Sequence, residues 1–547
     1  MPFLQSHRLL LITGVIFFIR ITFSAPLPVP AENEIYDFLD RIDRRGLITD
    51  YSDTYLPLNR NEVATYLKNI GNNLSQLNKI EKQVYQRFCS HFYPELGPQY
   101  INRDSDLFLD LENFLSNNIS SREQHLLKYE KGNGFIWGDS RIKIANWTKN
   151  KLRKQNFTGQ FLLRGSWENR LGGYIEFTRR KRLYGDMFKP SNFEQSNGKR
   201  KNYIQQQFQG GINYSDQTVE LGFYQQPFLW GASRENNLSM SNKAESFPYF
   251  RFSAEIGWLD YSIIHGSLTN DSSSFAKEKV SLQNKTMAKN LAAQRVEISL
   301  LKDIQVGLNE FVIYCNRDFE PAYLVPFSFY FSTEHYLEDR DNVLMSFDIE
   351  ANIIKNTEIY SSIFWDELKW SELGGEWWAN KHAIQFGIQY SNYFLGKPVD
   401  LQTEYTAIRP WTYTHEYFNN NFTHDRKVLG FPFGPNSQLF YMNVSSNITP
   451  RLKMEFEYNN LQHGENTGDK HYGGEATSNY DNRLRKYDHA TEWLMGQIKH
   501  QNDFAIRINY ECLNDFYLYA QLEYNRIKYD DKKEKNFYTL LGIDMRI

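Results

Sequence analysis

Two hydrophobic periods divide the chain. Between residues 32 and 95, apolar residues recur every three or four positions, which is the spacing of one face of an α-helix. From about residue 135 the period becomes two, so that apolar and polar side chains alternate along short runs. Such alternation gives a strand one apolar and one polar face. The pattern predicts a small helical segment followed by a much larger antiparallel β-structure.

The helical segment carries start and stop signals for three helices. The first apolar stripe covers residues 35–42 and ends before Gly46. Asn59 and Asn78 each precede a stripe and have a glutamate three residues later, which is the spacing of a capping box. Three short helices bury little apolar surface alone, so we expect them to dock on the β-structure.

Alternation is clearest toward the C-terminus. Residues 452–458, 518–524 and 537–547 all alternate, and the last run continues to the final residue. Ending inside an amphipathic strand is typical of the closing strand of an outer-membrane barrel. A soluble β-sandwich can end in the same way, so this feature leaves both open.

Strand arithmetic favours the barrel. Residues 135–547 supply about 18 strands at roughly 23 residues per strand and connection, within the range of outer-membrane barrels. The predicted fold is mainly β: a large antiparallel transmembrane β-barrel with a small N-terminal α-helical segment. We divide the chain into a signal peptide (1–25), a helical segment (26–130) that plugs the lumen or lies in the periplasm, and the barrel (131–547).

The position of one loop depends on how the last strands are read. If the C-terminus is periplasmic, the polar loop at residues 464–482 faces outside only when residues 491–510 form a single long strand. A turn at residues 501–503 would place that loop in the periplasm. Long loops of such barrels normally face outside, so we expect the single strand.

The N-terminus has the layout of a secretory signal. His7 and Arg8 precede an apolar stretch at residues 9–18, and Ser24-Ala25 offers small residues for cleavage. A membrane anchor is disfavoured because the stretch is shorter than about 20 residues and is followed by Arg20. We therefore expect export through a cleaved signal peptide to a Gram-negative-type outer membrane.

Composition narrows the function classes. Aromatic residues make up 16% of the chain, yet the mean hydropathy is −0.61, which suits aromatic residues on strands at a water boundary. A net charge of −3 argues against a nucleic-acid partner. Three cysteines without C-x-x-C spacing indicate neither a disulfide scaffold nor a zinc cluster.

Two groups of residues could bind a glycan. Trp370, Trp377 and Trp378 lie among charged residues and could act as platforms for sugar rings, although an interfacial aromatic girdle is the favoured interpretation. We also expect Arg409, Tyr413 and His415 to alternate on one strand face near Glu404. That group would line the lumen, as a glycan contact or, as we favour, as a salt-bridge ladder that braces the plug.

Signatures of catalysis are weak. His415-Glu416 lacks the second histidine of H-E-x-x-H, and neither G-x-S-x-G nor a P-loop occurs. The sequence therefore predicts no catalytic residue, no metal ligand and no cofactor. A secreted carbohydrate-active enzyme remains a distant alternative, because the exported chain is rich in aromatic and acidic residues.

Three blocks in order resemble the Wzi-like capsule-assembly proteins, a family of outer-membrane barrels with a helical N-terminal part. They are residues 35–41 with 56–62, residues 230–248, which include Trp230-Gly231, and residues 404–437. The central block departs from the family pattern, because Ala232-Ser233-Arg234 stands where a second glycine is expected. With the closing strand, the resemblance spans about residues 33–547.

The resemblance implies an 18-stranded barrel that assembles or holds surface polysaccharide at the cell face, as a lectin and without catalysis. The alternative is an outer-membrane pore for small solutes or saccharides. Expected partners are surface polysaccharide and outer-membrane lipid, with no nucleic acid, and a monomeric barrel is compatible with the sequence. The candidates for polysaccharide or lumen contact are Trp230, Arg234, Trp370, Trp377, Trp378, Glu404, Arg409, Tyr413 and His415.

Overall fold

The computed structural model describes most of the chain after the expected signal. The described residues are 26–96, 105–110, 124–132, 134–168, 170–185, 204–216, 218–269, 288–338, 340–372, 374–530 and 532–547. The signal predicted at residues 1–25 lies outside them.

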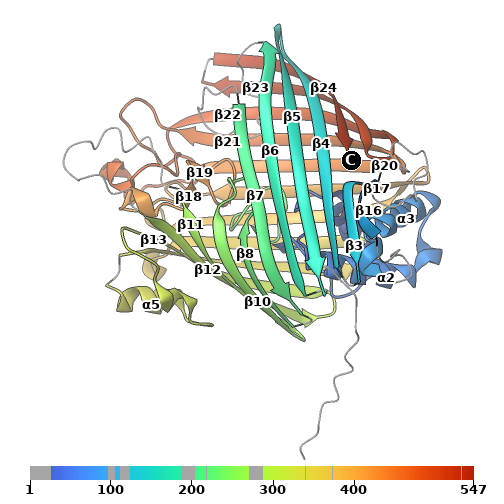
Figure 1. Ribbon diagram of the computed structural model, residues 1–547. Helices are drawn as coiled ribbons and strands as arrows, with labels where there is room; N and C mark the ends of the chain where they lie inside the picture. The colour runs from blue at the N-terminus through green and yellow to red at the C-terminus, as the bar shows by residue number, and fades with distance from the viewer. Residues whose placement is uncertain are drawn as a thin grey trace, which may run out of the picture.

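Eighteen strands of the described chain form a closed antiparallel barrel (Figure 1). Each strand pairs with the next, and the last strand, β24, closes the ring against the first, β4, with Arg546 opposite Arg141. The predicted fold class is thus confirmed. The strands are β4 (Gly134–Lys149), β5 (Leu152–Trp167), β6 (Leu171–Gly185), β7 (Ile204–Ser215), β8 (Val219–Gln225), β10 (Pro248–Ile256), β11 (Leu259–Leu268), β12 (Lys289–Leu301), β13 (Ile304–Cys315), β14 (Asn342–Ile354), β15 (Thr357–Glu367), β16 (Lys381–Phe394), β17 (Lys397–Ile408), β20 (Ser437–Thr449), β21 (Leu452–Glu465), β22 (Gln497–Leu513), β23 (Phe516–Tyr529) and β24 (Lys532–Arg546).

Within the described ranges, six further short strands lie outside this ring. A hairpin of β2 (Ser105–Asp110) and β3 (His125–Lys131) joins the barrel through pairing of β3 with the start of β4. Two-residue strands form two additional pairs: β1 (Tyr55–Leu56) with β9 (Leu229–Trp230), and β18 (Thr423–His424) with β19 (Lys427–Val428).

The alternation predicted from the sequence separates two faces of the wall. On β16 the outward side chains of Ile384, Phe386 and Ile388 are 37–49% exposed, whereas the inward Gln385 and Gln389 are buried. An apolar outer band of this kind is the surface that a barrel presents to lipid. No helix among the described residues is both long and apolar enough to cross a membrane.

The two ends of the barrel differ. At one, which we call the turn end, two-residue turns join β12 to β13, β14 to β15, β16 to β17, β20 to β21 and β22 to β23. At the other, the loop end, the long connections include residues 226–247, 316–341, 368–380, 409–436 and 466–496. Since β22 runs unbroken through residues 501–503, the prediction of one long strand there is confirmed.

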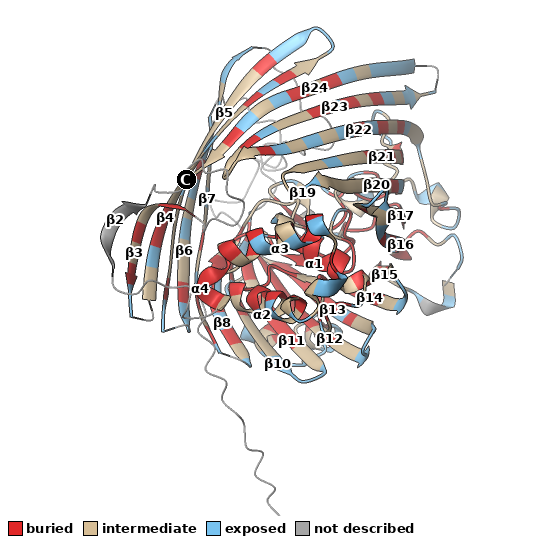
Figure 2. Ribbon diagram, turned by 90° about the vertical axis from the view of Figure 1, so that its right-hand side faces the viewer, coloured by how far each residue is buried: buried red, intermediate tan, exposed pale blue. Residues whose placement is uncertain are grey.

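Four helices lie at the turn end, within the arc of strands from β8 to β17 (Figure 2). The predicted capping boxes at Asn59 and Asn78 both form, because each asparagine and its glutamate satisfy each other's backbone N–H groups. The helices share one apolar core, which also includes Leu229 of β9. They are α1 (Glu34–Arg44), α2 (Arg60–Gly71), α3 (Lys79–His91) and α4 (Tyr93–Leu96).

Candidate functional site

An apolar core occupies the part of the lumen that is enclosed by strands β8 to β21. Two connections, residues 226–247 between β8 and β10 and residues 409–436 between β17 and β20, fold inward and pack against inward-facing wall residues such as Phe311. Trp230 and Tyr413 lie in this core and are at most 1% exposed. The Tyr413 hydroxyl donates to the carbonyl of Leu238 at 2.7 Å and so joins the two connections. Neither aromatic side chain can meet a glycan at the surface.

The expectation that Arg409, Tyr413 and His415 share a strand face is wrong. Strand β17 ends at Ile408, before all three. Pro410 has no N–H to continue the ladder, and Trp411 and Tyr413 adopt positive φ angles of 69° and 71°. The chain therefore leaves the wall and turns into the lumen.

Arg409 braces loops through hydrogen bonds. Its buried guanidinium donates to the carbonyls of Gly375 and Trp377 at 3.3 and 3.2 Å, and to that of Thr491 at 3.0 Å. These acceptors belong to the connections 368–380 and 466–496. Arg409 thus joins the two loops that cover the loop end.

Glu404 lies deeper, on the inner face of β17, and is 2% exposed. It accepts a hydrogen bond from the Tyr360 hydroxyl at 2.7 Å. Within the described chain, neither Glu404 nor Arg409 forms an ion pair, so the bracing role that we favoured rests on hydrogen bonds and not on a salt-bridge ladder.

Arg234 lies near the turn end and connects the lumen core to α1. It pairs with Asp40 at 2.5 Å and with Asp37 at 3.0 Å. The neighbouring charges of Lys453 and Arg234 hold the pKa of Asp37 below its ordinary value. The carboxylate therefore stays charged, which makes Arg234 a bridge between segments and not a glycan contact.

Aromatic side chains cover the loop end. The guanidinium of Arg483 stacks 3.7 Å from the Trp378 ring and also pairs with Asp488 at 3.0 Å. Trp377 packs against His489 with ring centroids 4.5 Å apart. Because these tryptophans contact the connection 466–496 and not the outer wall, the girdle interpretation fails for them. Trp370 lies in the connection 368–380, as do Trp377 and Trp378, within the short helix η4 (Trp370–Glu372), and its side chain is not described.

His415 belongs to the same aromatic group. Burial, reinforced by the charge of Lys381, lowers the pKa of His415 to about 3, so the ring is neutral and accepts a hydrogen bond from the Tyr417 N–H at 3.2 Å. Its ring is 6.2 Å from Tyr480, which in turn is 5.1 Å from Trp378. Tyr417 is 55% exposed and forms the outward edge of the group.

A small pocket opens within the cover, and most of its lining comes from residues that sequence reasoning did not nominate. We define the loop-end cover as the aromatic and charged residues gathered from the three connections. The polar run 466–496 does carry a signal for this cover, because its aromatic residues stand beside cations. The cover comprises Trp377, Trp378, Trp411, His415, Tyr417, His471, Tyr472, Tyr480, Arg483, Tyr487, Asp488 and His489.

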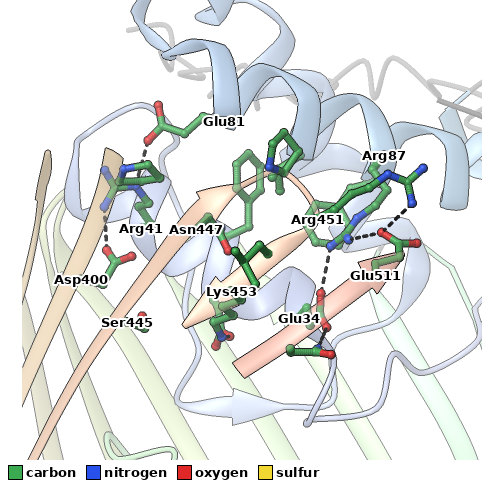
Figure 3. A pocket seen from close by; sticks show the side chains of 18 of the residues that line it. Glu34, Arg41, Glu81, Arg87, Asp400, Ser445, Asn447, Arg451, Lys453 and Glu511 are labelled. Carbon is green, nitrogen blue, oxygen red and sulfur yellow. Dashed lines mark hydrogen bonds and ion pairs between the residues drawn. The ribbon is translucent and has the colours of Figure 1, made fainter. Parts of the chain in front are cut away.

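A second cleft lies at the turn end, between the helices and the hairpins of the wall (Figure 3). Its cations have anionic partners: Arg41 bonds Glu81 and Asp400, both at 2.8 Å, and Arg87 bonds Glu511 at 3.1 Å. This pairing serves to dock the helices on the barrel.

The comparisons with known proteins agree with this architecture. The family model described as capsule assembly protein Wzi matches residues 156–540. A similar solved structure is that of Wzi from Escherichia coli, an outer-membrane protein involved in group 1 capsule assembly and described as a carbohydrate-binding β-barrel. The two sequences are 13% identical, the match covers 95% of this chain and 99% of that chain, and the TM-score is 0.59. OprD from Pseudomonas aeruginosa is 10% identical, with 75% and 95% covered, at a TM-score of only 0.42. No curated protein sequence matches significantly. The family model covers well over half of the chain, and the chain therefore belongs to the Wzi family of capsule-assembly proteins.

Proposed function

We propose that this protein is a non-catalytic outer-membrane barrel that holds a capsule or exopolysaccharide at the cell surface. Family membership and the description of the Escherichia coli relative as carbohydrate-binding support this class of function. The observation that carries the proposal for this chain is the loop-end cover, where aromatic rings and charged groups meet at one mouth of the barrel.

The orientation follows from the connections. Short turns of outer-membrane barrels face the periplasm and long loops face outside. The turn end and helices α1–α4 are then periplasmic, with the helices covering that mouth, and the loop-end cover faces the medium. Residues 1–25 serve as the cleaved export signal, and a single chain suffices because the strands close the barrel without a partner.

The loop-end cover has the chemistry of a saccharide surface. Aromatic rings such as those of Tyr417 and Trp377 offer flat faces to sugar rings. Arg485 and Lys486 are exposed on the connection 466–496 and can pair with acidic sugars, while carboxylates such as Asp488 accept bonds from hydroxyls. Arg409 holds the loops together beneath, so that the rings are presented on a fixed base.

A pore for small solutes, the other function left open by the sequence, is disfavoured by the packed lumen. Trp230, Leu238, Phe311 and Tyr413 meet there with almost no exposed surface. Interiors packed in this way leave few voids larger than a water molecule. A conduction path through this core would need the two connections to move.

The test compares polysaccharide on cells and in the medium. A deletion strain should move polysaccharide from cell to medium with the total unchanged, and the wild-type gene should reverse this. The double variant Trp377→Ala/Tyr417→Ala should fail to restore attachment. Trp167→Ala, which removes an exposed tryptophan at the opposite end of the wall, should restore it.

The outcomes separate the alternatives. An unchanged distribution in the deletion strain rejects attachment, and bilayer conductance of the purified protein then tests the pore. If deletion releases polysaccharide but the double variant retains it, attachment stands and the loop-end cover is not its site.

A further inference from the structure

The connection between β13 and β14 folds over the outside of the barrel wall. On β12 and β13 the inward side chains, including Leu291 and Phe311, belong to the lumen core. The residues next to them, Ala292 and Val312, must point outward, and they are fully buried. What buries them is a separate cluster formed by the connection itself, with Tyr323 and Tyr330. Figure 1 shows the helix of this connection, α5 (Tyr330–Tyr336), beside the barrel and not over its mouth.

This flap, which we define as residues 316–338, covers polar groups on the outer wall. Gln294 and Glu310 lie side by side on β12 and β13, and both point outward. Gln294 donates to Glu310 and to the flap carbonyl of Ser328, each at 2.5 Å, and accepts from the Tyr261 hydroxyl at 2.9 Å. The Tyr330 N–H completes the group with a bond to Glu310 at 3.3 Å.

These contacts fix the place of the flap. A carboxylate on the lipid face of a barrel is destabilising, and a buried polar group without a partner is costly. The flap removes Glu310 and Gln294 from that face and donates to the Glu310 Oε2 atom and accepts from Gln294. Its own fold is held by Asp341, which accepts from the Tyr323 hydroxyl at 2.6 Å and from Arg317 at 2.8 Å.

The outer face of the flap is apolar. Six large side chains are each at least 49% exposed, and the Phe327 ring rests on Tyr261 of the wall at 4.3 Å. The wall is apolar and exposed just beside the flap, at Leu308 and Phe250, which are 41% and 39% exposed. The apolar band of the wall thus continues onto the flap. The six side chains are Phe319, Val325, Phe327, Phe329, Phe331 and Tyr336.

We propose that residues 325–336 are seated in the outer leaflet of the membrane, with the phenylalanines against lipid acyl chains. Continuity with the lipid-facing wall selects lipid over a protein or a glycan as the occupant, because a segment lying on that wall has lipid as its neighbour. Aromatic side chains also concentrate where a membrane meets water. This inference rests on the membrane orientation proposed above.

The experiment uses the whole protein in vesicles of phosphatidylethanolamine and phosphatidylglycerol that contain a phospholipid with a diazirine in its acyl chain. After illumination and proteolysis, mass spectrometry maps the lipid adducts. We expect adducts on residues 325–336 at a yield comparable to that on the wall segment 384–390, and none on the loop-end segment 480–489.

The outcomes distinguish a failure of the flap inference from a failure of the proposed membrane insertion. Adducts on residues 384–390 but not on 325–336 overturn the flap inference while the barrel remains in the membrane. Adducts on neither segment overturn the insertion of the wall in the membrane and the flap inference together. As a second measurement, a water-soluble diazirine should label residues 480–489 and spare residues 325–336; strong labelling of the flap by this reagent would place it in water and contradict the proposal.

Discussion

Removing Arg41 should release the helical segment while leaving the barrel intact. The Arg41 guanidinium lies between α1, α3 and the hairpin of β16 and β17, and its side chain is 4% exposed (Figure 3). Besides its bonds to Glu81 and Asp400, it donates to the carbonyls of Val399 at 3.1 Å and Asn392 at 2.9 Å. It is therefore a direct polar link between helices and wall.

The size of the effect follows from the partners that remain. Breaking a buried ion pair by removing one partner costs about 3–5 kcal/mol, because the other charge stays buried. Glu81 keeps Arg45 at 3.0 Å and the Tyr393 hydroxyl at 2.6 Å, and Asp400 keeps the Ser391 hydroxyl at 2.6 Å. Since neither carboxylate is orphaned, we expect Arg41→Leu to cost about 3 kcal/mol, the lower end of that range.

Protease protection measures this loss. If cleavage of residues 34–96 requires the helices to undock, about 3 kcal/mol corresponds to a cleavage rate roughly 100-fold higher. The barrel should keep its folded mobility on gels run without heating. Lys79→Leu, which removes an exposed cation at the start of α3, is the matched control. An increase below about tenfold, equivalent to 1.4 kcal/mol, would refute the reasoning.

Three further predictions concern other parts of the molecule. Burial raises the pKa of Asp43 to about 8, so the stability that this group contributes is full below its unfolded pKa, about 3.8, and is lost as pH rises through 8. Protease protection of the helices should therefore fall from pH 5 to 8, and it should fall less steeply in Asp43→Asn. Equal slopes for the two proteins would contradict this prediction. Tyr413→Phe removes a buried hydroxyl donor and should lower the free energy of unfolding by about 1–2 kcal/mol. The loss should appear as a lower Tm in detergent, and an unchanged Tm would contradict the prediction. Gly473→Ala should displace the loop-end cover and release polysaccharide, because the added Cβ would lie 2.6 Å from the Trp411 backbone nitrogen. The control Gly468→Ala should retain polysaccharide on the cell, because φ is also positive there but nothing lies within 4 Å of the added Cβ. Equal behaviour of the two variants would exclude the clash as the cause.

Local features of the fold could be predicted because they depend on neighbours in the sequence. Capping boxes at Asn59 and Asn78 need only residues three apart, and both form. The strand count follows from chain length and a period of two, and the long strand β22 follows from the preference of long loops for one end.

The lumen core could not be predicted, because periodicity does not reveal on which side of the wall an apolar residue lies. Residues 226–247 contain apolar residues that could equally belong to a lipid-facing strand. Their place inside depends on β8 being only seven residues long and on the pairing of β9 with β1, which is 174 positions away at Tyr55 and Leu56. The same limit explains why the sequence alone favours a girdle position for Trp377 and Trp378.

Two of the three sequence blocks that carry the family resemblance supply most of the core in the lumen. Residues 230–248 and 404–437 meet through Tyr413 and Leu238, and again where the Ser241 hydroxyl donates to the Gly430 carbonyl at 2.8 Å. Any side chain at position 430 would place its Cβ 2.3 Å from the Leu238 carbonyl oxygen, so glycine is required there for packing. These residues specify a closed barrel with a solid core. Under the proposed function, selectivity for a glycan would come from residues that this core leaves at the surface, such as Arg485 and Lys486 of the connection 466–496, which are exposed and can change without disturbing the packing beneath.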